Sequence, residues 1–164
     1  MTFGDYYDII KFRAAEKQFS PSSAITDLLP QNNWEGSIVN INEITVLICD
    51  DSMFARKKLS MSISGFGVKA VYEAADGEEA VSKYKEFKPD VVFMDIIMPK
   101  VTGLEALKQI IAEDPDAKVI MASSVGTQSH LKDALKSGAV DFLQKPIADN
   151  DALKVLENVA KGVL

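Results

Sequence analysis

The stretch VVFMDIIMPKVTGLEAL (residues 91–107) determines the expected fold, because it contains one complete strand–loop–helix unit. It opens with four apolar residues, VVFM, that end at Asp95. The sequence Thr102-Gly-Leu-Glu105 then has the form of a capping box, and apolar side chains follow it at helical spacing. The stretch therefore predicts a short buried strand with a carboxylate at its C-terminal end, followed by an amphipathic helix.

The same unit recurs on both sides of this stretch, so that the regular part of the chain contains five units. Strands are predicted at residues 45–49, 69–73, 91–94, 119–122 and 139–143. Helices are predicted at residues 52–64, from Asp76 to the stop at Pro89, from Thr102 through Ile111, and at 127–137 and 150–161. Because the strands are apolar throughout, they are expected to be buried on both faces. The predicted fold class is α/β, a doubly wound five-stranded parallel sheet between two layers of helices.

Helical spacing also predicts which side chains face the core. Phe87 is expected inward on the second of these helices, and Leu131 and Leu135 on the fourth. The single cysteine, Cys49, is expected to be a small buried apolar residue of the first strand. The single histidine, His130, is expected on a helix surface.

Polar side chains follow four of the five predicted strands at their C-terminal ends. In doubly wound sheets, binding sites lie outside these ends, where the strand order reverses. The residues are Asp50 and Asp51 after the first strand, Asp95 after the third, Ser123 after the fourth and Lys145 after the fifth. The sequence therefore predicts that three carboxylates, a hydroxyl and an ammonium group meet at one rim of the sheet.

These groups favour phosphoryl chemistry with a metal ion. Three neighbouring carboxylates repel each other unless a cation joins them. Hard oxygen ligands suit Mg²⁺, and one histidine with one cysteine excludes a His-based metal cluster or a cysteine-rich zinc site. A carboxylate held against Mg²⁺ and the Lys145 ammonium can attack phosphorus, because both cations neutralise charge on the transferring oxygens. The Ser123 hydroxyl can donate to an acyl phosphate product.

The composition excludes several other classes of protein. The chain has 164 residues with 47% hydrophobic and 26% charged residues, which is typical of a globular domain. Its net charge of −6 disfavours broad binding to nucleic acid. No apolar run approaches the ~20 residues that span a bilayer, and the N-terminus has no signal-peptide core. We therefore expect a cytoplasmic protein that binds neither nucleic acid nor a membrane.

The first 44 residues differ from the rest of the chain. They are rich in aromatic residues, and the polar stretch PQNNWEGSIVNINEI (30–44) is typical of a linker. The sequence therefore divides into an extension with a linker, 1–44, and a regular domain, 45–164. Residues 8–17 have the pattern of an amphipathic helix. The extension either covers part of the domain's own surface or lacks order, or else it docks a partner or a second copy.

Four segments at the strand ends resemble a known family. They are VLICDDSMFARKKL (46–59), VVFMDIIMPKVTGLEAL (91–107), VIMASSVG (119–126) and AVDFLQKPI (139–147). Together they resemble the receiver domain of bacterial two-component response regulators, with the chemotaxis (CheY-like) type as the most similar. The resemblance covers about residues 45–164 and implies the strand order 2-1-3-4-5.

The resemblance also implies a role for each residue at the rim. Asp95 is the implied phosphoacceptor. Mg²⁺ is implied to bind Asp50, Asp51, Asp95 and the backbone carbonyl of Ile97. Ser123 and Lys145 are implied to contact the phosphoryl group, and Ser123 and Phe142 to form the switch. The bond between Lys145 and Pro146 is expected to be cis.

The resemblance further implies the partners of the protein. A histidine kinase is the expected phosphoryl donor, and the target is expected to be another protein, either part of the flagellar motor or another signalling protein. The chain is expected to catalyse only its own phosphorylation and dephosphorylation. Because the sequence stops at Leu164, directly after the last predicted helix, we expect no DNA-binding output domain.

Two departures from the family pattern and two alternatives are relevant. Ile97 and Val125 are apolar at positions that are polar in many relatives, which predicts slow loss of the phosphoryl group.

One alternative is a flavodoxin-like carrier of FMN, which the acidic turn CDDSMF (49–54) disfavours because it repels a phosphate. The other is a constitutive scaffold, which the complete set of acceptor-site residues disfavours.

Overall fold

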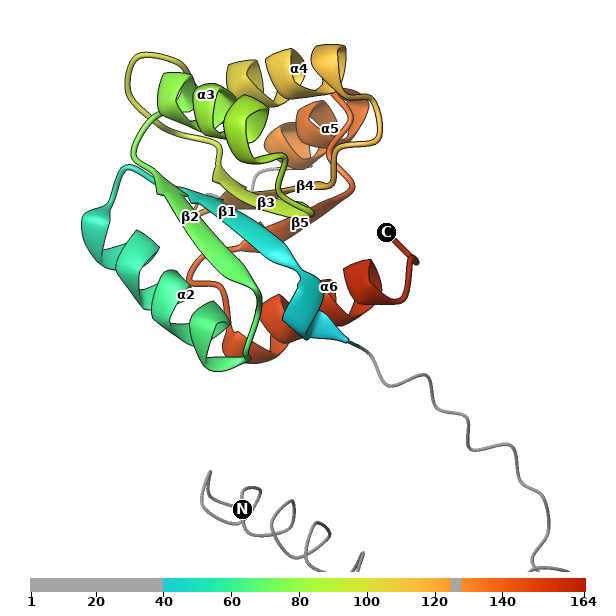
Figure 1. Ribbon diagram of the computed structural model, residues 1–164. Helices are drawn as coiled ribbons and strands as arrows, with labels where there is room; N and C mark the ends of the chain where they lie inside the picture. Colours follow the sequence, from blue (N-terminus) through green and yellow to red (C-terminus); the bar gives the residue numbers. More distant parts are fainter. Residues whose placement is uncertain (1–39, 125–127) are drawn as a thin grey trace, which may run out of the picture. The chain divides into compact units, whose positions relative to one another are not determined.

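The computed structural model describes residues 40–124 and 128–164, which form a doubly wound α/β domain (Figure 1). Its strands are β1 (Thr45–Cys49), β2 (Ala70–Ala74), β3 (Val91–Asp95), β4 (Val119–Ser123) and β5 (Asp141–Gln144). All four neighbouring pairs are parallel, and the strand order is β2-β1-β3-β4-β5. The predicted fold class and strand order are confirmed.

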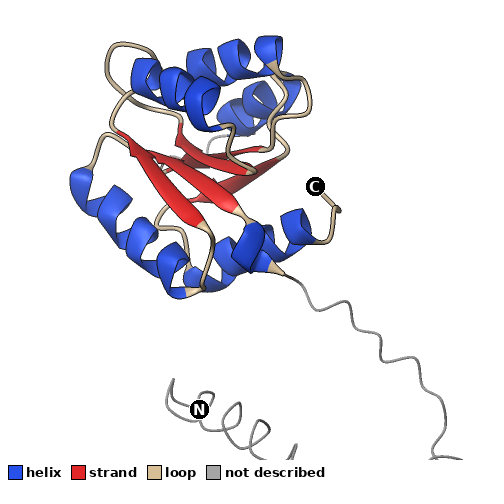
Figure 2. Ribbon diagram, in the orientation of Figure 1, coloured by secondary structure: helices blue, strands red, loops and turns tan. Residues whose placement is uncertain are grey.

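The helices cover both faces of this sheet (Figures 1 and 2). They are α2 (Met53–Gly65), α3 (Gly77–Phe87), α4 (Gly103–Glu113), α5 (Gln128–Lys136) and α6 (Asp149–Ala160), and a short 3₁₀ helix, η2 (Ile41–Glu43), precedes β1. Helices α2 and α6 lie on one face, and α3, α4 and α5 lie on the other. No helix in the described ranges is long and apolar enough to cross a membrane.

The three central strands carry the core. Their side chains alternate between the faces, so that Leu47 and Met94 pack with α3, α4 and α5, whereas Ile48 and Phe93 pack with α2 and α6. All four are nearly fully buried. The expected burial on both faces therefore holds for β1, β3 and β4. It does not hold for the two edge strands: β2 is only half-buried before Ala74, and β5 is exposed at both of its ends.

Three side chains that were expected to face the core are partly exposed. Phe87 is 37% exposed and stacks on Tyr72 of the edge strand β2, with ring centroids 4.1 Å apart. Leu131 and Leu135 are 38% and 47% exposed, whereas Ala134, expected on the same inner face of α5, is fully buried. A small side chain lets the short helix α5 lie close to the sheet, which leaves its two leucines at the margin of the contact.

Side chains cap three of the helices as the sequence predicts. Ser52 Oγ accepts the Ala55 N–H at the start of α2, and Thr102 and Glu105 form a complete capping box at the start of α4. At α3, the Asp76 carboxylate accepts the Glu79 N–H. The α4 cap directly follows the loop from Asp95, so it fixes the position at which this loop ends and the helix begins.

The packed domain includes residues before β1. Ile44 is 5% exposed, and Ile41 of η2 packs on the same apolar cluster as α2 and α6. The predicted extension up to residue 39, with its expected helix over 8–17, lies outside the described residues.

Candidate functional site

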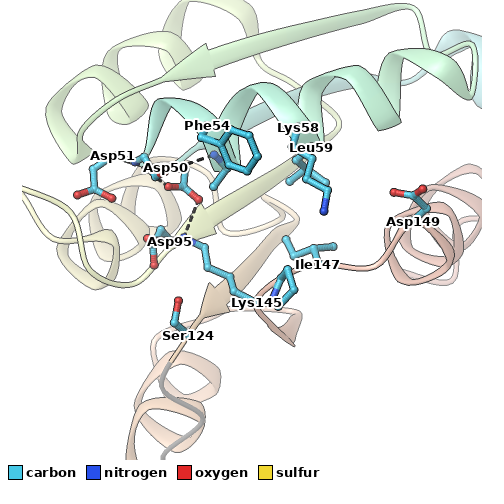
Figure 3. A pocket seen from close by; sticks show the side chains of 13 residues that line it. Asp50, Asp51, Phe54, Lys58, Leu59, Asp95, Ser124, Lys145, Ile147 and Asp149 are labelled. Atoms are coloured by element: carbon cyan, nitrogen blue, oxygen red, sulfur yellow. Dashed lines mark hydrogen bonds and ion pairs between the residues drawn. The ribbon is translucent and has the colours of Figure 1, made fainter.

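The rim predicted at the carboxyl ends of the strands is present, and its charged side chains converge (Figure 3). Carboxylate oxygens of Asp50, Asp51 and Asp95 lie within 4.8 Å of one another. Asp50 and Asp95 are buried, whereas Asp51 is exposed. Strand β1 ends directly before the first two, and β3 ends at the third, so the pairing of β1 with β3 brings the three together.

Lys145, directly after β5, reaches into this group. Its Nζ lies 2.6 Å from Asp50 Oδ2 and 2.5 Å from Asp95 Oδ2. Its backbone N–H donates to the Ser123 carbonyl at 2.9 Å, which ties the ends of β4 and β5 together. The Lys145–Pro146 peptide is cis, as expected.

Burial and charge act in opposite directions on these groups. Burial raises the pKa of Asp95, and the hydrogen bond from Lys145 opposes this shift without cancelling it. Burial lowers the pKa of Lys145, but its hydrogen bonds to Asp50 and Asp95 outweigh burial and raise the pKa above its usual value. The rim therefore holds two buried carboxylates around one ammonium, with a net negative charge.

The backbone and side chain of Asp50 are held by several contacts. Its N–H donates to the Ala74 carbonyl at 3.1 Å, and its Oδ1 accepts the Ser52 N–H at 2.9 Å. Its backbone carbonyl accepts a hydrogen bond from Arg56 Nη1 at 2.6 Å. Arg56 was not predicted as part of the site, because nothing in a helical pattern distinguishes an inward-turned arginine from a solvated one.

The loop after Asp95 depends on two glycines that the sequence analysis also missed. A Cβ at Gly103 would lie 1.8 Å from the Asp95 backbone oxygen, and one at Gly77 would lie 2.3 Å from the Val101 oxygen. Each glycine is the first residue of its helix, directly after the capping residue. Glycine is a poor helix former, so a glycine directly after a good capping residue indicates that another part of the backbone lies close to it. The sequence contained this indication at both positions.

The remaining predicted residues lie around the carboxylates. Ser123 is fully buried at the end of β4, and Ser124 is the residue there that lines the pocket. Ile97 is 59% exposed, and its N–H donates to Asp95 Oδ1 at 3.3 Å. Phe142 is half-buried on β5, against the cluster that contains α3, α4 and α5. Val125 lies outside the described residues.

A pocket of about 450 Å³ opens from the carboxylates along α2 (Figure 3). Its far wall is formed by Pro146 and Ile147 of the segment that leads into α6. Phe54 lines it from α2 and is 79% exposed. The buried acids are therefore reached from an open groove with apolar and charged walls.

The donor set fits Mg²⁺. The carboxylates supply hard oxygen ligands close enough to share one ion, and the exposed side of Asp51 leaves room for water ligands.

Cys49 is buried in β1, and burial raises the pKa of its thiol, which excludes a thiolate ligand. His130 lies on α5 and is half-buried rather than on the surface, with its Nδ1 unpaired within the described part of the chain.

A doubly wound sheet with buried acids and a lysine at its rim defines a class of phosphoryl-accepting signalling domains. Comparison with known proteins agrees: the family model of the response regulator receiver domain matches residues 46–157, so the chain belongs to that family. It is a CheY-like receiver domain. The chemotaxis protein CheY of Listeria monocytogenes is 48% identical over 118 residues, covering 72% of this chain and 99% of that protein.

A second sequence relative and a solved structure support the same assignment. The chemotaxis protein CheY of Thermotoga maritima is 45% identical over 116 residues, covering 71% of this chain and 97% of that protein. A crystal structure of a CheX–CheY–BeF₃–Mg²⁺ complex from Borrelia burgdorferi matches with a TM-score of 0.65 and 41% identity. That match covers 74% of this chain and 90% of the compared chain.

Proposed function

We propose that the protein is a phosphoryl-accepting switch in which Asp95 receives the phosphoryl group of a histidine kinase and a protein target reads the result. The observation that carries this proposal is the contact of one ammonium, Lys145 Nζ, with both Asp50 and Asp95 inside a group of three carboxylates. We place the switch in the cytoplasm.

The residues of the chain have separate roles in this proposal. An Asp95 carboxylate oxygen attacks phosphorus, a P–O bond forms, and the bond from phosphorus to the donor breaks with its electrons leaving on the donor. Mg²⁺ held by Asp50, Asp51, Asp95 and the Ile97 carbonyl would neutralise charge on the phosphoryl oxygens. The ammonium of Lys145 turns toward the same oxygens.

The signal then has to leave the site through the protein. Ser123 is drawn toward the phosphoryl oxygen, and Phe142 enters the space that it leaves. The two arrangements must differ by only a few kcal/mol for a phosphoryl group to shift their populations. Helix α5 packs on β5, and Leu131, Leu135 and Val140 are partly exposed on α5 and directly before β5, which suits contact with another protein.

Acyl phosphate formation tests the proposal. We expect the full chain, incubated with acetyl phosphate and Mg²⁺, to gain one phosphoryl group by intact mass. Asp95→Asn should gain none, and a sample with the Mg²⁺ chelated should stay unmodified. Equal modification of the Asp95→Asn variant would show that another residue is the acceptor.

Amide chemical shifts test the switch separately. Adding beryllofluoride, a phosphoryl mimic, should shift amides within residues 123–164, which include α5, β5 and α6. Changes confined to residues outside that range would contradict the proposed output surface, even if Asp95 is the acceptor.

A further inference from the structure

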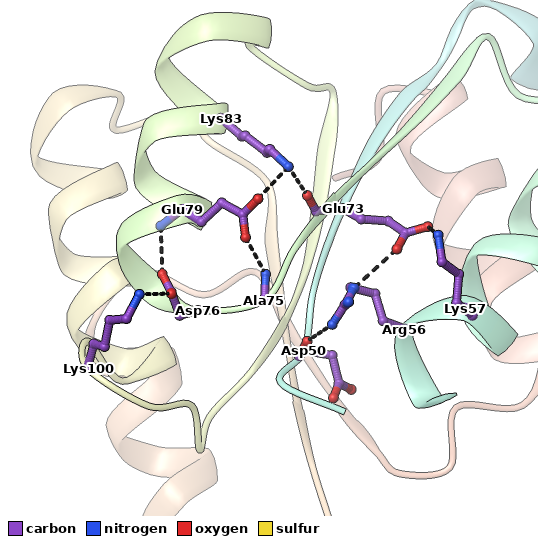
Figure 4. A network of polar contacts seen from close by, with 9 residues as sticks. All are labelled: Asp50, Arg56, Lys57, Glu73, Ala75, Asp76, Glu79, Lys83 and Lys100. Atoms are coloured by element: carbon purple, nitrogen blue, oxygen red, sulfur yellow. Dashed lines mark hydrogen bonds and ion pairs between the residues drawn. The ribbon is translucent and has the colours of Figure 1, made fainter. Parts of the chain in front are cut away.

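Outside the rim, a chain of charged contacts connects α2, β2 and α3 (Figure 4). Arg56 Nε donates to Glu73 Oε2 at 3.1 Å, while its Nη1 donates to the Asp50 carbonyl at 2.6 Å. Lys57 pairs with the other oxygen of Glu73 at 2.9 Å. On the far side of β2, the Lys83 ammonium donates to the Glu73 backbone carbonyl.

Arg56 differs from the other cations of this network in burial and in its contacts. Its side chain is 14% exposed and that of Glu73 is 22% exposed, whereas that of Lys57 is 61% exposed. A guanidinium presents several N–H groups in a fixed plane, so it can bind two acceptors at once. Arg56 therefore joins Glu73 on β2 to the backbone of Asp50, whereas the ion pair of Lys57 within the described residues is with Glu73 alone.

The contact fixes the peptide that carries a metal ligand. The Asp50 N–H is bound to Ala74 on β2, and the Asp50 carbonyl is bound to Arg56, which is itself held on β2 by Glu73. Both polar groups of the Asp50 backbone are thus anchored to the C-terminal part of one strand. These contacts fix where the side chain starts, and the Ser52 N–H and the Lys145 ammonium then hold its two carboxylate oxygens toward the rim.

We propose that Arg56 is a positioning residue for the metal site: held by Glu73, it orients Asp50 for Mg²⁺ without touching the ion. This inference rests on the proposed Mg²⁺-dependent function of the rim. Residues that orient metal ligands typically contribute about 10–100-fold to metal affinity. The charge of Arg56 by itself repels Mg²⁺, so its direct effect on Mg²⁺ affinity is opposite in sign to its positioning effect.

That opposition gives the inference a clear test. If Arg56 acted only through its charge, its removal would tighten Mg²⁺ binding. If it orients Asp50, its removal loosens Mg²⁺ binding despite the lost repulsion. The direction of the change in Mg²⁺ affinity therefore separates the two roles, provided that a variant with an equal loss of stability elsewhere is compared.

The experiment is calorimetric titration of Mg²⁺ into the full chain, with urea unfolding in the absence of Mg²⁺ for each variant. We expect the Kd for Mg²⁺ to rise about tenfold in Arg56→Met. Arg56→Lys keeps the charge but not the two-point contact, so it should show most of the same rise. Lys57 also pairs with Glu73 but does not contact the Asp50 carbonyl. Lys57→Met is therefore the matched control, and its Kd should stay within about twofold of the wild type.

Two further variants keep the result interpretable. Tyr84→Phe removes a 2.7 Å hydrogen bond from the tyrosine hydroxyl to Asp114, away from the rim, so it reports what a stability loss alone does to Mg²⁺ affinity. We expect no change in its Kd. If Arg56→Met does not fold, Glu73→Gln, which weakens the anchor of Arg56, should raise the Kd in the same direction.

The outcomes distinguish this inference from the proposed function. The positioning role is overturned if Arg56→Met binds Mg²⁺ as tightly as the wild type or more tightly, or if Lys57→Met loses as much affinity as Arg56→Met. In that case the metal site itself is still supported if Asp50→Asn loses Mg²⁺ binding. A wild-type chain that binds no Mg²⁺ at millimolar concentration overturns both.

Discussion

Gly103 illustrates how closely single residues define the rim. Its backbone lies so near Asp95 that an added Cβ would meet the Asp95 carbonyl oxygen at 1.8 Å. Neither partner can move aside cheaply, because Gly103 begins a helix and Asp95 ends a central strand. The start of α4 and the end of β3 are thus packed backbone against backbone.

A single methyl group at this position should therefore be costly. We expect Gly103→Ala to lower the free energy of unfolding by about 3 kcal/mol, through overpacking in a rigid contact. Urea unfolding measures this change. Gly65→Ala is the matched control, because a Cβ at Gly65 has nothing within 4 Å, and it should be neutral or stabilising by up to about 1 kcal/mol. Equal effects of the two substitutions would contradict the account of the close approach.

We predict that Ile97 limits how water is positioned at the proposed acyl phosphate. It is largely exposed beside Asp95, and its side chain offers no group that can hold a water molecule by a hydrogen bond. We expect Ile97→Asn to speed loss of the phosphoryl group about tenfold, or ~1.4 kcal/mol in barrier, by orienting water. A dephosphorylation time course checks this, with Ile97→Val as the apolar control. A polar variant no faster than the wild type would refute it.

At the scale of elements, the start of α3 combines a cap with charge. Asp76 caps the helix, and Lys100 from the β3–α4 loop pairs with it at 2.6 Å (Figure 4). Glu79 accepts the Ala75 N–H at 2.7 Å and pairs with Lys83 at 2.6 Å. The hydrogen bond from Lys83, followed by that from Ala75, holds the pKa of Glu79 below its usual value.

That lowered pKa predicts a pH dependence of stability. Since the folded state favours ionised Glu79, its contribution is complete above the ordinary glutamate pKa and is lost as the pH falls through the lower folded pKa. Glu79→Gln should lower the free energy of unfolding by about 0.5 kcal/mol at pH 7, a small value because the side chain is partly exposed. Urea unfolding at decreasing pH should show the difference shrink once the pH falls below the ordinary glutamate pKa. Glu86→Gln, exposed on the same helix, is the control, and a difference for Glu79→Gln that persists at low pH would contradict the assignment.

Most elements could be predicted from the sequence, because local patterns specify them. Apolar runs gave the central strands β1, β3 and β4, and capping residues gave the starts of α2, α3 and α4 to within a residue. The order of the strands came from the family resemblance, since each crossover is compatible with several orders. The edge strand β5 was expected at 139–143 but lies at Asp141–Gln144, because the predicted run included the turn before it.

The charged members of the candidate site could be predicted as well, because they directly follow buried strands. What the sequence did not reveal are the contacts that hold them. Arg56 and Gly103 both contact backbone carbonyls. Every residue has a backbone carbonyl, so the identity of the contacted residue does not reveal such a contact. The exposure of Leu131 and Leu135 was missed for a related reason, because helical spacing shows an apolar face but not how far the sheet extends beneath it.

At the scale of the molecule, the boundary of the folded domain precedes β1. Ile41 and Ile44 pack on the cluster beneath α2 and α6, so the cut between extension and domain should fall before them. The extension itself is proposed to be separable, because five strand–helix units complete the sheet.

Two truncations test this division. Deleting residues 1–39 should leave cooperative urea unfolding and phosphorylation by acetyl phosphate unchanged. Deleting residues 1–44 should cost about 2–3 kcal/mol in the free energy of unfolding, since it removes the buried side chain of Ile44 and the packing of Ile41. If the shorter deletion abolishes cooperative unfolding, residues of the extension belong to the core.

In the proposed function, the whole fold serves to present one aspartate, Asp95, for phosphorylation. The most direct test treats the full chain with acetyl phosphate and Mg²⁺, reduces the acyl phosphate with borohydride, and maps the modified residue by peptide mass spectrometry. Reduction converts a phosphorylated aspartate to homoserine, and we predict homoserine at Asp95 alone. Homoserine at Asp50 or Asp51, or at no aspartate, would contradict the claim.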